Sequence, residues 1–306
     1  MKRRILITTI VTITLLLFLV PPVLSQPNAE DLTITILYDN YQFQEDMLSG
    51  WGFSCLVEGT GETILFDIAS NAVITNMEKL GIDLEIVDVV VFSHIHPDHT
   101  DGAMAFWQQN SNVTVYIPAS WPESVRNVIQ NSVMKCIETH DPVEVCDGVY
   151  LTEDLPSIAG GGSATVFGIF ATIAQTREQA LAIKTAKGLV IITGCAHPGI
   201  VEIVKRVKEI TSEDNIYLLI GGFHLLDKGT QQIKEIINDL NNENVKKVSA
   251  THCTGDSAIA LFKEEYGDDF IPTGVGKEII IEAAFPISSV YPQDKLTTTW
   301  GLVKFK

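Results

Sequence analysis

The sequence predicts a four-layer αββα sandwich, a mixed α/β (α+β) fold in which two β-sheets lie between two layers of helices. Two observations favour it. Strand-like apolar or alternating runs occur along both halves of the chain, and helical patterns accompany them in both halves. With 306 residues, of which 46% are hydrophobic, the chain can bury a sizeable core.

The N-terminal segment is set apart from this fold. Lys2, Arg3 and Arg4 precede an apolar run, and Val23-Leu24-Ser25 resembles the pattern before a signal-peptidase cut. We interpret residues 1–25 as a signal peptide and residues 26–306 as one domain, so the protein is expected to be exported to the periplasm or the extracellular space. The alternative is a membrane anchor at residues 5–24, because an uncleaved run of that length can span a bilayer.

The first half of the domain is expected to open with strands. Residues 32–38 alternate between apolar and polar, and residues 51–58 and 63–67 are typical of a hairpin across Gly59-Thr60-Gly61. The run from Ile86 to Phe92 has the β-branched composition of a buried strand. The other expected elements are helices at 71–80, 103–108 and 122–130, and strands at 113–117, 143–151 and 164–173.

The second half is expected to begin with a hairpin of residues 179–184 and 188–193. Strands and helices then alternate. The expected helices cover 200–210, 233–240 and 257–266, and the expected strands 216–220, 246–250 and 277–282.

A cluster of metal-binding residue types follows the strand at 86–92. Of the 7 histidines in the chain, His94, His96 and His99 fall in this one stretch, together with Asp98. His94 and His96 can aim at one point, and Asp98 and His99 can address a second point a few ångströms away. Imidazole and carboxylate together suit zinc, iron or manganese. The alternative, a histidine-rich polar loop, is disfavoured by this concentration of histidines.

The pattern His-x-His-x-Asp-His, with the Thr100-Asp101-Gly102 that follows it, resembles the hallmark of the metallo-β-lactamase superfamily. The resemblance implies a metallo-β-lactamase-like αββα fold with a metal site between the two sheets. It also implies that Asp67 orients a metal-binding histidine from behind, and that His252 binds a second metal. Cys195 stands where many members carry an aspartate that bridges two metals, which puts the usual carboxylate-bridged pair in doubt.

Two histidines that follow Cys195 in the sequence are further candidates for the metal site. His197, two residues after Cys195, could replace a ligand, and Cys195 could supply a thiolate. His224 follows Gly221-Gly222 and could be a ligand, a proton shuttle or a substrate contact. We therefore expect one or two divalent ions, zinc or else manganese or iron, held by His94, His96 and His197 and by Asp98, His99 and His252.

A wider set of motifs resembles one branch, the 7,8-dihydropterin-6-methyl-4-(β-D-ribofuranosyl)aminobenzene-5′-phosphate synthase-like proteins. The motifs are Trp51-Gly52-Phe53-Ser54, Leu65-Phe66-Asp67, Gly194-Cys195-Ala196-His197, Gly221-Gly222-Phe223-His224 and Thr251-His252-Cys253-Thr254-Gly255. The resemblance implies a synthase that joins a dihydropterin pyrophosphate to an aminobenzene ribosyl phosphate, but an export signal fits that cytosolic step badly.

Three functions follow from these residues. The leading hypothesis is a hydrolase in which metal-bound water attacks an ester, lactone or phosphoester, and Asp98 orients that water or accepts its proton. The alternatives are a transferase of the synthase type and a non-catalytic metal-binding or sensing protein. We expect a small-molecule substrate, with anionic molecules among the candidates, and no membrane contact if the signal is cleaved.

Charge and cysteines limit the remaining partners. The net charge of −17 argues against nucleic acid, whose phosphates would be repelled, and no pattern predicts the oligomeric state. An exported chain could pair Cys136 with Cys146 across a turn. His140, in that turn, is interpreted as a surface-loop residue.

Overall fold

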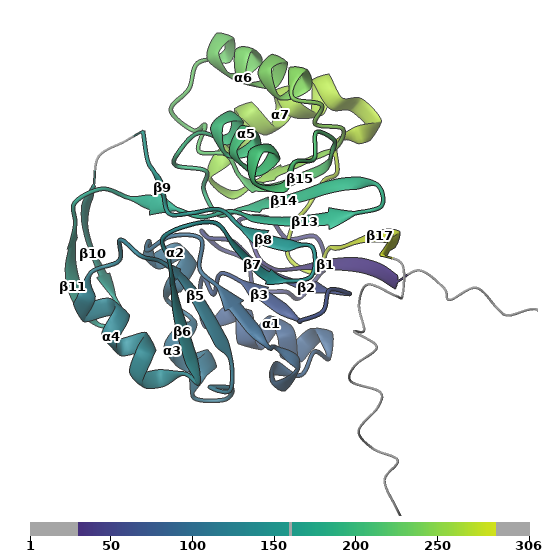
Figure 1. Ribbon diagram of the computed structural model, residues 1–306. Helices are drawn as coiled ribbons and strands as arrows, with labels where there is room; N and C mark the ends of the chain where they lie inside the picture. Colours follow the sequence, from purple (N-terminus) through teal and green to yellow (C-terminus); the bar gives the residue numbers. More distant parts are fainter. Residues whose placement is uncertain (1–29, 159–160, 286–306) are drawn as a thin grey trace, which may run out of the picture.

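The structure, a computed structural model, describes residues 30–158 and 161–285 and has the predicted four layers (Figure 1). One layer is a seven-stranded sheet. Its strands are, in spatial order, β17 (Glu278–Phe285), β1 (Glu30–Tyr38), β2 (Ser54–Glu58), β3 (Ile64–Phe66), β4 (Val89–Val91), β5 (Thr114–Pro118) and β6 (Lys135–Thr139). The pairs from β3 to β6 are parallel, and the others are antiparallel.

The second layer is a six-stranded sheet. Its order is β16 (Val248–Thr251), β15 (Ile216–Gly222), β14 (Gly188–Thr193), β13 (Leu181–Thr185), β8 (Val149–Leu151) and β7 (Val143–Cys146). The strands β14, β15 and β16 are parallel, and β14 pairs with β13 as the predicted hairpin. Two small ribbons complete the strands: β9 (Leu155–Pro156) with β12 (Arg177–Glu178), and β10 (Gly162–Val166) with β11 (Ile169–Ile173).

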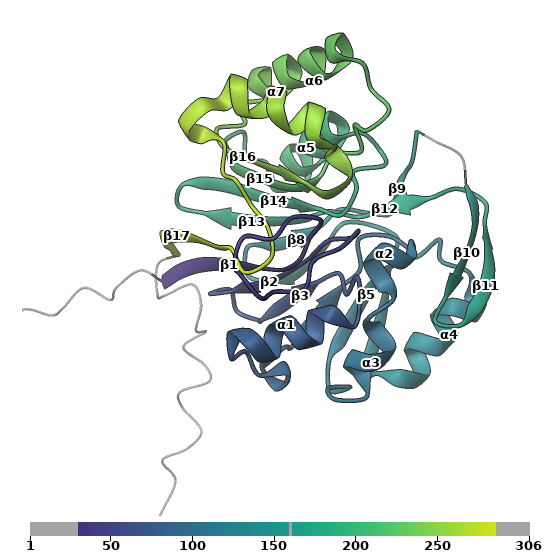
Figure 2. The same ribbon diagram turned by 180° about the vertical axis from the view of Figure 1, so that it is seen from behind.

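Helices cover the outer faces of both sheets (Figures 1 and 2). On the seven-stranded sheet lie α1 (Ala72–Leu80), α2 (Pro97–Thr100), α3 (Ala103–Trp107) and α4 (Glu123–Ser132). On the six-stranded sheet lie α5 (Ile200–Thr211), α6 (Thr230–Asn242) and α7 (Asp256–Tyr266). Short 3₁₀ turns occur at η1 (Leu84–Ile86), η2 (His252–Thr254) and η3 (Gly267–Asp269).

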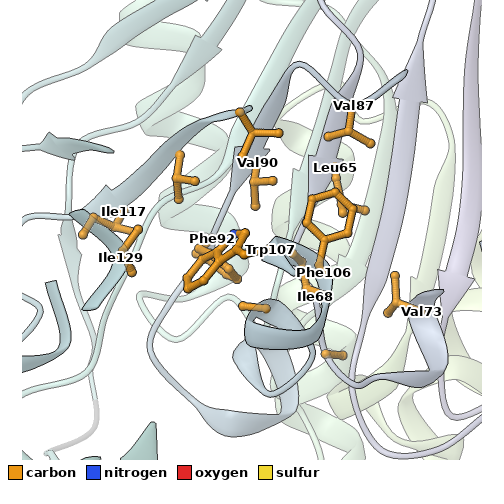
Figure 3. Close-up of a cluster of buried hydrophobic side chains, with 14 of the residues drawn as sticks. Leu65, Ile68, Val73, Val87, Val90, Phe92, Phe106, Trp107, Ile117 and Ile129 are labelled. Carbon is orange, nitrogen blue, oxygen red and sulfur yellow. The ribbon is translucent and has the colours of Figure 1, made fainter. Parts of the chain in front are cut away.

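The strand side chains divide between three apolar cores. In β4, Val89 and Val91 point into the core between the sheets, whereas Val90 points into the core under the first helical layer. Figure 3 shows Val90 in that outer core with Phe92, Phe106 and Trp107. Because alternate side chains point to opposite faces and both faces are covered, the strand is apolar throughout. This explains the uninterrupted valine run that precedes the histidine cluster.

Some sequence expectations were wrong. Residues 143–151 form two strands, β7 and β8, that turn at Asp147-Gly148, where Gly148 has φ +74°. Residues 164–173 likewise belong to a hairpin, because Phe167 and Gly168 take φ +52° and +77°. The strand β6 was not predicted at all. Its exposed Lys135 and half-buried Glu138 break the apolar pattern, since β6 is an edge strand of its sheet.

The disulfide considered between Cys136 and Cys146 was also wrong. All five cysteines are free thiols, and Cys136 and Cys146 lie on β6 and β7, which belong to different sheets. His140 is exposed between these strands, as predicted. The expected signal peptide or anchor at residues 1–25 lies outside the described residues. Within residues 30–158 and 161–285, no helix has the length and apolar character needed to cross a bilayer.

Candidate metal centre

The predicted site residues meet where parallel strands of both sheets end. Asp67 directly follows β3, and His94 follows β4 after two residues. From the other sheet, Cys195 and His197 follow β14, and His224 and His252 follow β15 and β16. The carboxyl ends of parallel strands are the usual place for a site in sheets of this kind, since their loops converge there.

His94, His96 and His197 form a first donor group. One ring nitrogen from each lies within 4.8 Å of the other two. His94 Nε2 is 3.1 Å from His96 Nδ1, and the His197 ring centroid lies 4.6 Å from that of His94. His94 and His197 are buried and His96 is half-buried. The structure therefore brings together the three residues predicted for one metal.

Asp98, His99 and His252 form a second group, and Cys195 joins it. The four donor atoms lie within 4.8 Å of one another. His99 Nε2 is 3.3 Å from both His252 Nε2 and Cys195 Sγ, and Asp98 Oδ2 is 3.5 Å from His252 Nε2. These are the three residues predicted for the second metal, with a thiol added.

Every histidine in these two groups is held from outside by its other ring nitrogen. His94 Nδ1 lies 2.9 Å from Ser93 Oγ, His99 Nδ1 lies 2.7 Å from Asp67 Oδ2, and His252 Nδ1 lies 3.1 Å from Asn40 Oδ1. The same holds for His96 Nε2, 3.3 Å from Thr176 Oγ1, and for His197 Nδ1, 2.9 Å from Glu178 Oε2. Such outer partners fix the ring orientation and aim one nitrogen at a common point.

Asp67 has the position that the sequence resemblance implied. It is fully buried and contacts His99 directly. It also accepts hydrogen bonds from the backbone N–H and the hydroxyl of Ser93, both at 2.7 Å. Since Ser93 Oγ contacts His94 as well, one carboxylate orients a histidine from each donor group.

Glu178 is a functional residue that the sequence interpretation missed. Its carboxylate is fully buried on β12 and accepts the backbone N–H groups of all four residues of Gly194-Cys195-Ala196-His197, at 2.9 to 3.1 Å. Burial alone would raise the pKa of Glu178, but the His197 side chain and these amides lower it. The only available signal was an acidic residue beside the apolar strand that begins at Leu181.

The close approach of these side chains shifts the pKa values of the histidines and of Asp98. Burial and the neighbouring histidines lower the pKa of His94, and the pKa of His96 falls to about 4. At His99 burial acts in the same direction, but the charge of Asp67 outweighs it and raises the pKa to about 9. Burial would raise the pKa of Asp98, yet hydrogen bonding to His252 and nearby histidines lower it.

This donor set fits a divalent metal. His252 Nε2 and Cys195 Sγ both lie 3.3 Å from His99 Nε2, and these three atoms have few favourable arrangements unless a proton or a cation lies among them. Imidazole, carboxylate and thiolate are ligands that zinc accepts. Burial raises the pKa of the Cys195 thiol, so a thiolate there needs a cation beside it. The geometry thus identifies the residues that could bind a metal.

Cys195 and His224 occupy the boundary between the groups. Besides the second group, Cys195 Sγ lies within 4.8 Å of the donor atoms of His197 and His224. The thiol therefore lies among the donor atoms and not behind them. His224 is exposed, its ring centroid is 4.5 Å from that of His197, and a hydrogen bond with Cys253 raises its pKa.

The loops of the centre carry backbone strain. Asp67, Ala196, His224 and His252 all have φ between +51° and +57°, a region that residues with a Cβ rarely adopt. Gly194 has a related role, because a Cβ there would lie 2.1 Å from Ser93 Oγ. The chain thus accepts unfavourable local conformations in order to hold these side chains.

Two cavities flank the centre. One, of about 570 Å³, is lined by polar and aromatic residues that include Trp51, Asp98 and Asp101. The Trp51 ring also packs on His252 at 4.7 Å between centroids. The other, of about 310 Å³, opens beside His197 and His224. Each cavity therefore reaches a different donor group.

A four-layer αββα sandwich with this centre at its strand ends defines a protein of the metallo-β-lactamase fold. Comparison with known proteins agrees. The profile of the metallo-β-lactamase superfamily matches residues 52–161. The chain is 30% identical over 285 residues to the 7,8-dihydropterin-6-methyl-4-(β-D-ribofuranosyl)-aminobenzene-5′-phosphate synthase of Methanocaldococcus jannaschii, covering 82% of this chain and 97% of the synthase. The chain belongs to the metallo-β-lactamase superfamily, in the branch that contains this synthase.

Solved structures share the fold. A metal-dependent hydrolase of the β-lactamase superfamily is 27% identical, with a TM-score of 0.68 over 82% of this chain and 99% of that one. The metallo-β-lactamase fold protein YhfI of Bacillus subtilis is 16% identical, with a TM-score of 0.57 over 82% of this chain and 100% of that one. The second likeness concerns the fold alone.

Proposed function

We propose that this protein is a metal-dependent hydrolase that acts on an ester, lactone or phosphoester of a small molecule. The observation that carries the proposal is the meeting of two donor groups, His94–His96–His197 and Asp98–His99–His252, with Cys195 between them. A divalent ion held by these residues would supply Lewis-acid chemistry, lowering the pKa of a bound water and polarising a carbonyl or phosphoryl oxygen. The first of the solved structures above is described as a hydrolase, which supports the same reaction class.

Asp98, Cys195 and His224 would have separate roles in the reaction. The lowered pKa of Asp98 keeps its carboxylate ionised, which suits a metal ligand that also orients water. Cys195 would offer a thiolate ligand to the centre, where other members carry an aspartate. His224 is exposed beside His197, and its raised pKa suits a group that donates a proton to the leaving group.

Metal content and turnover test the proposal together. Protein reconstituted with zinc or manganese should retain at least one equivalent by elemental analysis. It should hydrolyse members of a panel of esters, lactones and phosphodiesters, and His96→Ala should abolish this turnover. Retention of less than one equivalent would refute the metal centre. Bound metal without turnover of any panel member would favour the non-catalytic metal-binding hypothesis.

The role of His224 is tested separately. His224→Asn should lower kcat by about 100-fold or more while metal content stays unchanged, since general acid catalysis contributes about that much. His140→Asn is the matched control, because His140 is an exposed loop histidine far from the centre in sequence. Loss of metal in His224→Asn would instead make His224 a ligand.

A transferase is the second candidate, and the 30% identity to a synthase favours it. In that reaction the ions would bind a leaving pyrophosphate, and no water need attack. Mixing a dihydropterin pyrophosphate with the ribosyl aminobenzene phosphate tests it directly. Formation of the condensed product, followed by mass spectrometry, would replace hydrolysis as the assignment.

We also propose that residues 1–25 direct export and are then removed. The basic, apolar and small-residue regions of this segment support the proposal. Mass spectrometry of the protein from the source cells should give a chain that begins at Gln26. A full-length chain in the membrane fraction would support the anchor instead.

A further inference from the structure

The smaller of the two flanking cavities has an apolar floor. It lies between α5, α6 and the loop that follows β15, and it measures about 310 Å³. Ile200, Phe223 and Leu225 are buried at its base, and Val201 and Ile236 contribute partly buried side chains from the two helices. Its wall includes His197 and the exposed His224, so the cavity adjoins the metal centre.

Both lysines that line this cavity are paired with carboxylates. Lys205 Nζ lies 3.3 Å from Glu202 Oε1, and Lys228 Nζ lies 3.2 Å from Asp227 Oδ2. With Asp239 the lining holds three acidic residues and two lysines. Even with a protonated His224, the lining has no net positive charge to attract a phosphate or a second carboxylate, and binding depends on the apolar surface.

We propose that this cavity binds an uncharged apolar group of the substrate, alkyl or aryl, while the reactive carbonyl or phosphoryl oxygen reaches the metal centre. The inference rests on the proposed hydrolase and specifies its substrate class. The group would enter past His224 and lie between Val201 of α5 and Ile236 of α6. The larger cavity, beside Trp51, Asp98 and Asp101, would face the polar remainder of the molecule.

Binding of straight-chain carboxylates tests the proposal without requiring turnover. Their carboxylate mimics a hydrolysis product at the metals, and their chain probes the cavity. Isothermal titration of the zinc-loaded protein with the series from acetate to decanoate should show Kd falling by about fourfold for each methylene that enters the cavity. The fall should stop once the chain is longer than the cavity.

Variants that fill the cavity locate the effect. Ile236→Trp should remove most of the chain-length dependence and leave acetate binding unchanged. Ile259→Trp is the matched control. Ile259 is also a partly buried helical isoleucine, but it lies on α7 and lines a different cavity. Val201→Phe gives a second test from α5, and circular dichroism with zinc analysis verifies that each variant is folded and loaded.

The outcomes separate this inference from the proposed function. Two outcomes would overturn the binding of an apolar group in this cavity, even if the protein hydrolyses short substrates. They are equal Kd values along the carboxylate series, and the same dependence of Kd on chain length in Ile236→Trp as in Ile259→Trp. Tighter binding of alkyl phosphates that weakens with salt and ignores chain length would overturn it too. Absence of hydrolysis of the whole panel would refute the enzyme and leave the binding result standing.

Discussion

Glu178 binds all four backbone N–H groups of the loop that carries Cys195 and His197. The His197 side chain and these amides together keep the buried carboxylate ionised, as in other concave arrangements of amides that bind anions. At the scale of single residues it links the orientation of His197 to the conformation of a whole loop.

Glu178→Gln should weaken metal binding. The amide keeps the size of the side chain, but its NH₂ group must face an N–H donor of His197 or of the loop. We expect about 10- to 100-fold lower zinc affinity, measured by competition with a chelator, because outer partners of ligands contribute about that much. Glu235→Gln, on the exposed surface of α6, is the control. Equal affinities in the two variants would contradict the role of Glu178.

The pH dependence of metal binding depends on Asp67 and His99. In the metal-free protein the pKa of His99 is raised from 6.5 to about 9, so a metal must displace its proton below that pH. Zinc affinity should therefore rise with pH, and the contribution of His99 to this rise should end near pH 9. The stability that the Asp67–His99 pair gives the metal-free protein has the opposite pH dependence. It is complete below pH 6.5 and is lost as pH rises through 9.

Asp67→Asn isolates this effect, because it removes the charge that holds the His99 proton. In this variant the contribution of His99 to the rise should end at a lower pH than in the wild type. Titration calorimetry in buffers of different ionisation enthalpy would count the protons released. An unchanged pH profile would show that another group controls binding.

The individual site residues were largely predictable, and the reason is chemical. His94, His96, Asp98 and His99 are rare metal-ligand types crowded into one stretch, and His197 and His252 each follow a recognisable buried strand. Glu178, Thr176 and Asn40 were not predictable. Their roles arise from contacts between residues distant in the chain, and nothing in their neighbouring sequence differs from an ordinary polar turn.

At the scale of elements, the loops after the strands need glycine where backbones from the two sheets approach each other. At Gly194 a Cβ would lie 2.1 Å from Ser93 Oγ and 3.2 Å from Asp67 Oδ2. The end of β14 therefore rests directly on the group that orients His94 and His99.

Gly194→Ala should destabilise the protein by about 1–3 kcal/mol, the usual result of forcing extra atoms into a packed interior. Urea unfolding gives the free energy, and zinc affinity should fall in parallel. Gly162→Ala on β10 is the matched control, since a Cβ there meets no heavy atom within 4 Å. Equal stability of the two variants would show that the loop adjusts freely.

The elements themselves were predicted well wherever both faces of a strand are buried. The runs that became β4, β14 and β15 consist almost entirely of apolar residues, which leaves little ambiguity. Turns inside longer runs were missed. Asp147-Gly148 and Phe167-Gly168 each reverse the chain within a stretch whose alternation continues on both sides, so the pattern alone does not show two strands.

At the scale of the whole molecule, each donor group combines residues from the two halves of the sandwich. His94 and His96 come from the seven-stranded side, and His197 comes from the six-stranded side. Asp98 and His99 meet His252 in the same way. A bound ion would therefore join the two halves, in addition to the apolar core between the sheets.

Metal removal should consequently lower global stability. Dialysis against a chelator should reduce Tm, and adding zinc should restore it in proportion to the logarithm of zinc concentration, with about 4 kcal/mol gained at a thousandfold excess over Kd. His252→Ala should show a smaller gain. A Tm independent of zinc would mean that the ions bind folded and unfolded chains equally.

The separation of the ligands along the chain also governs when the centre can assemble. His99 and His252 are 153 residues apart in sequence, yet their Nε2 atoms lie 3.3 Å apart. During synthesis the histidine cluster of the first half emerges long before its partners, so a nascent chain offers only half of each coordination sphere. The first donor group is complete once β14 has joined its sheet, but capture of an ion by the second group must wait for β16. Loading of the second group is therefore one of the last events in the maturation of this protein.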